Sequence, residues 1–118
     1  MVTFGAFVRK RREELKAADA ARYSLRQVAT RVGIEPAYLS KIENEKTESL
    51  SEEKIRSLAS DLMVDDVELL ARANKVPADV LEIIRTHPRA FADLILALRG
   101  KPESAIFRVV REVSDGDW

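Results

Sequence analysis

Apolar residues along this chain recur three and four positions apart, a spacing that predicts a series of short α-helices. The first helix is expected to begin after Thr3, a suitable N-cap, and to end at about Ala17. Its apolar stripe comprises Phe4, Phe7 or Val8, and Leu15, and its other faces carry Arg9, Lys10, Arg12 and Lys16. The helix-prone segment 17–23 that follows is compatible with a longer helix or with a loop.

Two short helices joined by a tight turn are predicted between Ser24 and Asn44. Ser24 is a good N-cap, and Gly33 suits a turn with positive φ because it has no Cβ. Glu35 and Pro36 suit the cap and the first position of the second helix, which is expected over 36–43. The predicted inward residues are Leu25, Val28, Ala29 and Val32 in the first helix and Leu39 and Ile42 in the second. The outward or terminal positions of the second helix are Pro36, Ala37, Ser40, Lys41 and Glu43.

A polar loop and two more helices complete the N-terminal part. The loop covers 44–49, and Asn44 is the residue best suited to a left-handed helix end. Ser49 or Ser51 is expected to cap the next helix, whose apolar side is formed by Leu50, Ile55, Leu58, Ala59 and Leu62. Asp65-Asp66 begins a fifth helix, which ends near Asn74 and carries Val67, Leu69, Leu70 and Ala71.

The prolines Pro77, Pro88 and Pro102 divide the C-terminal part and predict three apolar helices over about 78–86, 88–98 and 102–113. Together they contain about 40 residues, too few to form an independent core. Their apolar surface is therefore expected either to pack on the N-terminal part or to pair with the same segment of a second chain. The candidate residues for a dimer or partner surface are Ile84, Phe91, Ile95, Phe107, Val110 and Trp118.

The net charge is zero, but the charges are unevenly distributed. Residues 1–31 carry eight basic and three acidic side chains, a net +5, so the remainder carries −5. This polarity can orient the N-terminal part towards phosphates. The chain has no Cys, a single His and no apolar run approaching the roughly 18 residues of a membrane span. We therefore expect a soluble, cytoplasmic protein with no metal, no cofactor and no membrane partner.

The segment 25–44 contains the runs Leu-Arg-Gln-Val-Ala, Val-Gly-Ile and Pro-Ala-Tyr-Leu-Ser-Lys-Ile-Glu-Asn. With its small Ala29 and its turn residue Gly33, it resembles the Xre/Cro-type, or phage-repressor, helix-turn-helix family, over roughly residues 4–74. The resemblance implies an all-α chain. A five-helix repressor-like DNA-binding domain at 1–74 would be followed by a three-helix extension at 75–118 that serves in dimerisation or partner binding.

The resemblance also implies a function, namely a sequence-specific regulator of transcription, in the simplest case a repressor or autoregulator. Such a protein binds a palindromic operator in double-stranded DNA as a homodimer. By the same resemblance, the residues that read bases are Glu35, Pro36, Ala37, Ser40 and Lys41. Those that contact the DNA backbone are Arg26, Gln27, Tyr38 and Lys46, with Arg9, Arg12 and Arg22 as further candidates. For Tyr38, partial burial of its ring between helices is an equally good explanation.

The base-reading set is short of polar side chains. Lys41 is the best reader of guanine, because an ammonium can approach O6 and N7 together. Pro36 and Ala37 stand where many members of the family carry polar residues. DNA shape, flexible arms or dimer spacing is therefore expected to supply part of the specificity.

Two other classes of function compete with this interpretation. An enzyme is not expected, because adjacent carboxylates such as Glu13-Glu14 diverge on a helix and His87 lies at a helix boundary. An antitoxin-like or regulatory protein is the stronger alternative, since family members also hold a toxin, peptidase or other enzyme encoded nearby. That function needs the apolar face of residues 78–113 and Trp118, whereas a DNA regulator needs Arg26, Gln27 and Lys41.

Overall fold

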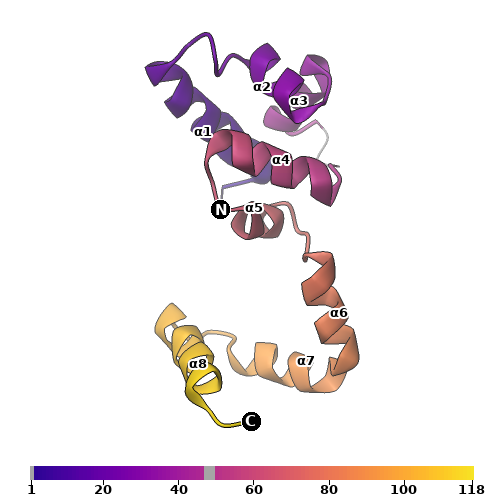
Figure 1. The fold of residues 1–118 in the computed structure, drawn as a ribbon, viewed down its shortest axis with the longest axis vertical. Coiled ribbons are helices and arrows are strands. Elements are labelled where there is room, and N and C mark those ends of the chain that lie inside the picture. Colours follow the sequence, from indigo (N-terminus) through magenta and orange to yellow (C-terminus); the bar gives the residue numbers. More distant parts are fainter. Residues whose placement is uncertain (1, 47–49) are drawn as a thin grey trace. The chain divides into compact units, whose positions relative to one another are not determined.

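The computed structural model describes residues 2–46 and 50–118 and shows an all-α chain. Within these ranges the helices, shown in Figure 1, are α1 (Phe4–Ala18), α2 (Leu25–Val32), α3 (Pro36–Glu43), α4 (Glu52–Leu62), α5 (Asp66–Arg72), α6 (Ala78–Thr86), α7 (Pro88–Ala97) and α8 (Glu103–Asp115). The predicted all-α fold, with five helices followed by three, is confirmed. Segment 17–23, for which the sequence left two possibilities, ends α1 and then forms a turn.

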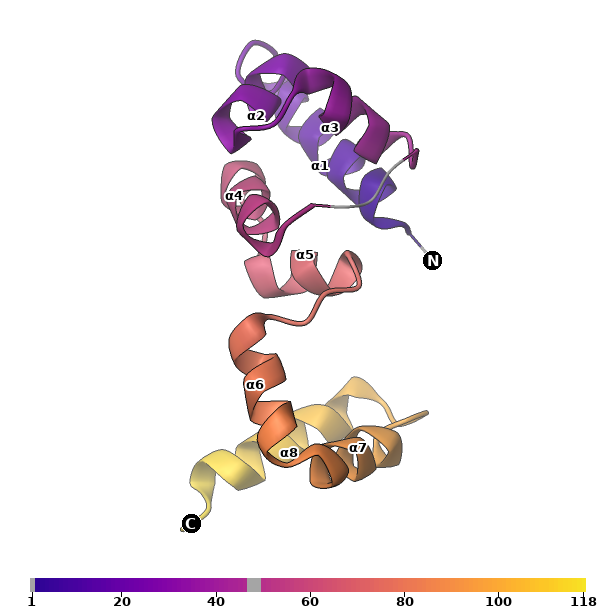
Figure 2. The same ribbon diagram turned by 90° about the vertical axis from the view of Figure 1, so that its right-hand side faces the viewer.

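The chain divides into two compact units, Met1–Pro77 and Ala78–Trp118. The first unit contains α1–α5. In it, α3 packs against α1 and α2, and α4 packs against α1, α2 and α5 (Figures 1 and 2). All five helices contribute to one core, whose largest fully buried side chains are Val8, Val28, Leu39, Ile42, Ile55, Leu58, Leu62, Leu69 and Leu70. Full burial of each stabilises the unit by about 1.5–3 kcal/mol relative to exposure.

Side chains cap most helix starts in the first unit as predicted. The hydroxyls of Thr3, Ser24 and Ser51 each accept a backbone N–H three residues on, at 3.2 Å. Asp65 accepts from the N–H of Glu68 at 2.8 Å. The alternative cap Ser49 lies outside the described residues. Glu35 occupies the N-cap position of α3 as expected, but its side chain makes no cap hydrogen bond. Pro36 does occupy the first turn.

Helices α2 to α5 all end in one hydrogen-bonding pattern, in which a residue with positive φ is followed by an N–H that reaches back to the last turn. The positive-φ residues are Gly33, Glu45, Met63 and Asn74. At the end of α3, Glu45 donates to the Ile42 carbonyl at 3.1 Å and Lys46 to that of Lys41 at 2.8 Å. The left-handed conformation expected at Asn44 is therefore wrong. Asn44 has φ −95° and continues the last turn, so the reversal falls one residue later.

The second unit contains α6–α8 and differs in burial. None of these three helices contains a buried residue. The large apolar side chains left exposed are Val80, Ile83, Leu94, Ile95, Leu96, Ile106, Phe107, Val110, Val113 and Trp118. Trp118 is 92% exposed, although its indole N–H donates to the Val113 carbonyl at 2.9 Å. Across the described residues, no helix is both long and apolar enough to cross a membrane.

Candidate nucleic-acid interface

Helices α2 and α3 are held at a tight corner by backbone hydrogen bonds. Gly33 has φ +85°, and its N–H and that of Ile34 reach back to the Ala29 carbonyl at 2.9 and 3.0 Å. Any L-residue with a side chain would be strained at this φ. Ala29 itself is fully buried where α2 meets its neighbours, so a small side chain is required there. The corner thus brings α3 across the end of α2, as predicted.

A buried ion pair fixes the far end of α3 to α1. Arg12 donates from Nε and Nη2 to the two carboxylate oxygens of Glu43 at 2.7 and 2.8 Å, and from Nη1 to the Tyr23 carbonyl at 3.2 Å. The two side chains are only 8% and 3% exposed. The hydrogen bonds to Glu43 raise the pKa of Arg12, while burial acts in the opposite direction. This two-pronged contact determines how α3 is presented.

The outward orientation expected for Arg12 is therefore wrong, and Arg12 is not available to a phosphate. Glu43 is a terminal residue of α3, as one of the two expected positions allowed, but it is buried. The sequence did contain the signal. Arg12 lies four residues after Val8 and eight after Phe4, on the buried face of α1, and Glu43 lies four residues after Leu39. A charged residue in register with a buried apolar stripe indicates that it is paired with an opposite charge in the interior, because burying an unpaired charge costs too much free energy.

A second ion pair connects α2 to α4. Arg31 donates to both carboxylate oxygens of Asp61 at 2.6 and 3.0 Å, and also to the carbonyl of Arg22 at 2.6 Å. The hydrogen bonds to Asp61 raise the pKa of Arg31. The guanidiniums of Arg31 and Arg22 lie 5.4 and 5.7 Å from the centre of the Tyr23 ring. Arg31 is thus engaged in structure, while Arg22 remains exposed beside the start of α2.

The residues predicted to read bases lie together on α3, opposite its buried side. Leu39 and Ile42 are at most 1% exposed and face the core. Glu35, Ala37 and Lys41 are exposed, and Pro36 and Ser40 are half-buried. The side chain of Lys41 forms no hydrogen bond or ion pair within residues 2–46 and 50–118, so its charge is not compensated there.

The residues predicted to contact the DNA backbone flank this face. Arg26 and Gln27 are exposed in the first turn of α2, and Lys46 is exposed just after α3. The N-terminus of α2 adds a partial positive charge beside Arg26. Tyr38 is half-buried and packs against the core, in agreement with the alternative that its ring is partly buried between helices.

Asn44 is a polar residue of this surface to which sequence reasoning gave no DNA-related role. Its side-chain nitrogen Nδ2 donates to the Ser40 carbonyl at 2.8 Å and lies 3.3 Å from the Ser40 hydroxyl oxygen. The spacing of four residues on a helix is what brings the two together. Asn44 therefore covers the last turn of α3, next to a predicted base reader.

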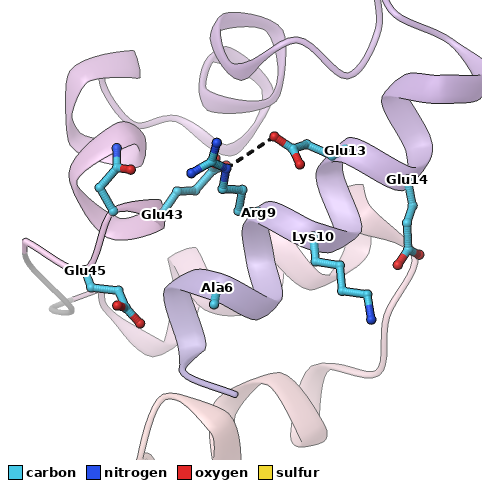
Figure 3. Close-up of a pocket in the computed structure, with 8 residues that line it drawn as sticks. Ala6, Arg9, Lys10, Glu13, Glu14, Glu43 and Glu45 are labelled. Carbon is cyan, nitrogen blue, oxygen red and sulfur yellow. Dashed lines mark hydrogen bonds and ion pairs between the residues drawn. The ribbon is translucent and has the colours of Figure 1, made fainter. Parts of the chain in front are cut away.

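An open groove of about 650 Å³ lies between α1 and the residues that follow α3 (Figure 3). Arg9 in this groove is paired with Glu13 at 3.2 Å, and Figure 3 shows the two side chains reaching towards each other. Lys10, Glu14 and Glu45 complete its charged lining. Acidic groups therefore offset the basic ones here, which makes Arg9 a poorer phosphate contact than Arg26 or Lys46.

The residues predicted for a dimer or partner surface all lie in the second unit. Ile84 and Phe91 are half-buried. Ile95, Phe107 and Val110 are between 55% and 57% exposed, and Trp118 is almost fully exposed. These side chains remain available for contact, whereas residues of comparable size in the core of the first unit, such as Leu58 and Leu62, are fully buried.

Comparison with known proteins agrees with this geometry. A protein-family model described as a helix-turn-helix domain matches residues 3–81, about two thirds of the chain. The chain belongs to this helix-turn-helix family, and the predicted resemblance is confirmed. Proteins of this family bind DNA as regulators and are typically not enzymes. No curated protein and no solved structure matches the chain.

Proposed function

We propose that this protein is a sequence-specific transcriptional regulator, a repressor or autoregulator, that reads double-stranded DNA through the exposed face of α3. The observation that carries the proposal is the position of Lys41. It is exposed and unpaired among the described residues, on a helix that a buried ion pair fixes in place. A fixed helix with a free cation is suited to the major groove, where Lys41 would approach guanine O6 and N7.

The proposal assigns the remaining surface residues by their position. Glu35, Pro36, Ala37 and Ser40 would face base edges with Lys41, while Arg26, Gln27, Lys46 and Tyr38 would hold the sugar-phosphate backbone. Pro36 and Ala37 offer no hydrogen bond, although Ala37 can contact a thymine methyl group. Few direct contacts per half-site favour an arrangement in which two half-sites are bound together.

We further propose that the regulator acts as a homodimer on a palindromic operator, with residues 1–74 as the DNA-binding domain and 75–118 as the association region. The second unit supports this, because a 41-residue segment with no buried residue in any of its helices lacks a core of its own. Burying its exposed apolar side chains against a second copy would supply that core. The two α3 helices would then meet half-sites about 34–36 Å apart.

The test is fluorescence anisotropy with DNA from upstream of the protein's own coding region and with random DNA of equal length. Wild-type protein is expected to prefer the upstream DNA. In the Lys41→Ala variant, the ratio of the affinities for upstream and random DNA is expected to fall by about five- to 150-fold, the range for one good base contact. Lys101→Ala removes the same charge from the other unit and is the matched control. Equal, salt-sensitive binding of both DNAs by wild type and Lys41→Ala would overturn the proposal.

The second candidate function is that of a protein that holds a neighbouring enzyme through α6–α8. The exposed apolar side chains of these helices, Phe107 and Trp118 among them, favour it as a specific observation. Co-expression with proteins encoded nearby, followed by purification, separates the two functions. A stable complex lost in Phe107→Asp but retained in Lys41→Ala would support partner holding, whereas the DNA regulator requires that Lys41→Ala weaken sequence-specific DNA binding.

A further inference from the structure

The amide of Asn44 has a fixed orientation in this structure. Its Nδ2 lies 2.8 Å from the carbonyl oxygen of Ser40, and a carbonyl oxygen can only accept a hydrogen bond. The nitrogen, rather than the oxygen, of the amide must therefore face this turn, which removes the usual ambiguity of an Asn side chain. The same nitrogen lies 3.3 Å from the Ser40 hydroxyl oxygen, which consequently serves as an acceptor.

The hydroxyl proton of Ser40 is left unused by this arrangement. In a helix, such a proton is commonly donated to the carbonyl four residues earlier. Thr30 and Thr86 do this, with distances of 2.9 Å to the Arg26 carbonyl and 3.0 Å to that of Glu82. Within the described residues, the Ser40 hydroxyl donates to no group. Ser40 thus differs from both threonines in keeping its donor available.

Ser40 also lies where that donor can meet a base. It is four residues after Pro36 and three after Ala37, on the side of α3 opposite the buried Leu39 and Ile42. Neither Pro36 nor Ala37 has a polar side-chain group, so the Ser40 hydroxyl faces no competing donor or acceptor from them.

We propose that Asn44 is a positioning residue that makes Ser40 a hydrogen-bond donor to a base edge. This inference rests on the proposed function, since it requires α3 to lie in the major groove. In that groove guanine presents O6 and N7, adenine presents N7 and thymine presents O4 as acceptors, whereas cytosine presents only the N4 donor. The contacted base is therefore guanine, adenine or thymine, and cytosine is excluded at that position of each half-site because it has no acceptor for this proton.

The test is selection of binding sites from a random double-stranded DNA library, with sequencing of the bound fraction. Wild-type protein is compared with Ser40→Ala, Asn44→Ala and Asn44→Asp. In Asn44→Asp the carboxylate cannot donate to the Ser40 carbonyl and turns away from it, and it can only accept a hydrogen bond from the Ser40 hydroxyl, which then turns its lone pairs to the groove. Ser57→Ala, an exposed serine on α4, is the matched control, and thermal unfolding of each variant verifies that it is folded.

Wild type is expected to exclude cytosine at one position of the half-site. Ser40→Ala and Asn44→Ala are expected to relax that exclusion about two- to tenfold, the range of one net hydrogen bond. Asn44→Asp is expected to favour cytosine there, and Ser57→Ala to leave the motif unchanged. The new charge of Asn44→Asp lowers affinity for all sequences alike, so it does not alter base frequencies.

Three results would overturn the inference. In the first, wild type selects cytosine at the position that Ser40→Ala affects. In the second, Ser40→Ala leaves the motif unchanged. In the third, Ser40→Ala alters the base preference but both Asn44 variants keep it. None of them weakens the proposed function, because each requires that wild type select a motif. Failure of wild type to enrich any sequence would instead overturn the proposed function itself.

Discussion

The two units of this chain have similar helical patterns but differ in how they use their apolar residues. In Met1–Pro77, side chains such as Leu58 and Leu62 are fully buried in one core. In Ala78–Trp118, comparably amphipathic helices have no buried residue, and Phe107 is 57% exposed. The comparison shows that helical periodicity specifies a face that must be covered, whereas chain length and packing decide whether the same molecule can cover it.

The largest effect is expected from the buried ion pair of the first unit, which has no counterpart in the second. Arg12→Met is expected to lower the free energy of unfolding by about 3–5 kcal/mol, because Glu43 is left buried without its partner. Urea unfolding followed by circular dichroism measures this. The double variant Arg12→Met/Glu43→Met is the control and is expected to recover most of the loss. If the free energy of unfolding of Arg12→Met lay within about 1 kcal/mol of that of wild type, this explanation would be contradicted.

A matched pair of core and surface substitutions compares the units directly. Leu58→Ala, at a fully buried position, is expected to destabilise the first unit by about 2–5 kcal/mol. Ile95→Ala, at a position 56% exposed, is expected to leave the first unit's unfolding unchanged and to weaken self-association. Trp118 is the only tryptophan, and both tyrosines lie in the first unit, so fluorescence distinguishes the two transitions. Equal destabilisation by both variants would remove the distinction between the units.

A smaller effect is expected at the end of α4. Met63 has φ +55° and is 62% exposed, so Met63→Gly relieves backbone strain without losing packing. The variant is expected to raise the free energy of unfolding by about 1 kcal/mol. Ser60→Gly, three residues earlier within the helix, is expected to lower it by about 1 kcal/mol. Thermal unfolding of both variants measures the difference, and a shift of the same sign in both would contradict the explanation.

The smallest effect on stability is expected from removing the second unit. The free energy of unfolding of a chain ending at Pro77 is expected to lie within about 0.5 kcal/mol of that of the first unit in the full-length protein, because the core residues of this unit all precede Pro77. Sedimentation velocity is expected to show a monomer, and affinity for a two-half-site operator is expected to fall. A truncated protein that remained dimeric would place the association surface in residues 1–77 instead.

The sequence by itself determined the helices and the corner between two of them. Ser24, Gly33 and Pro36 act locally, through a cap, a positive φ and a fixed φ, so their effects could be predicted from neighbouring residues alone. The apolar stripe of α4 was predictable for the same reason, because every turn repeats the same face. The family resemblance followed from this local pattern and is confirmed.

The tertiary structure decided which polar residues are free and which are engaged. Arg12 and Lys41 are both basic residues of helices, and the register of Arg12 with Val8 indicated that it is buried. Only the packing of α1 against α3 shows that Glu43 is its partner, while Lys41 stays exposed. The reversal at Glu45 rather than Asn44 likewise depends on how the last turn of α3 closes. Such outcomes depend on partners distant in sequence, 31 residues away for Arg12 and Glu43, which a local pattern does not encode.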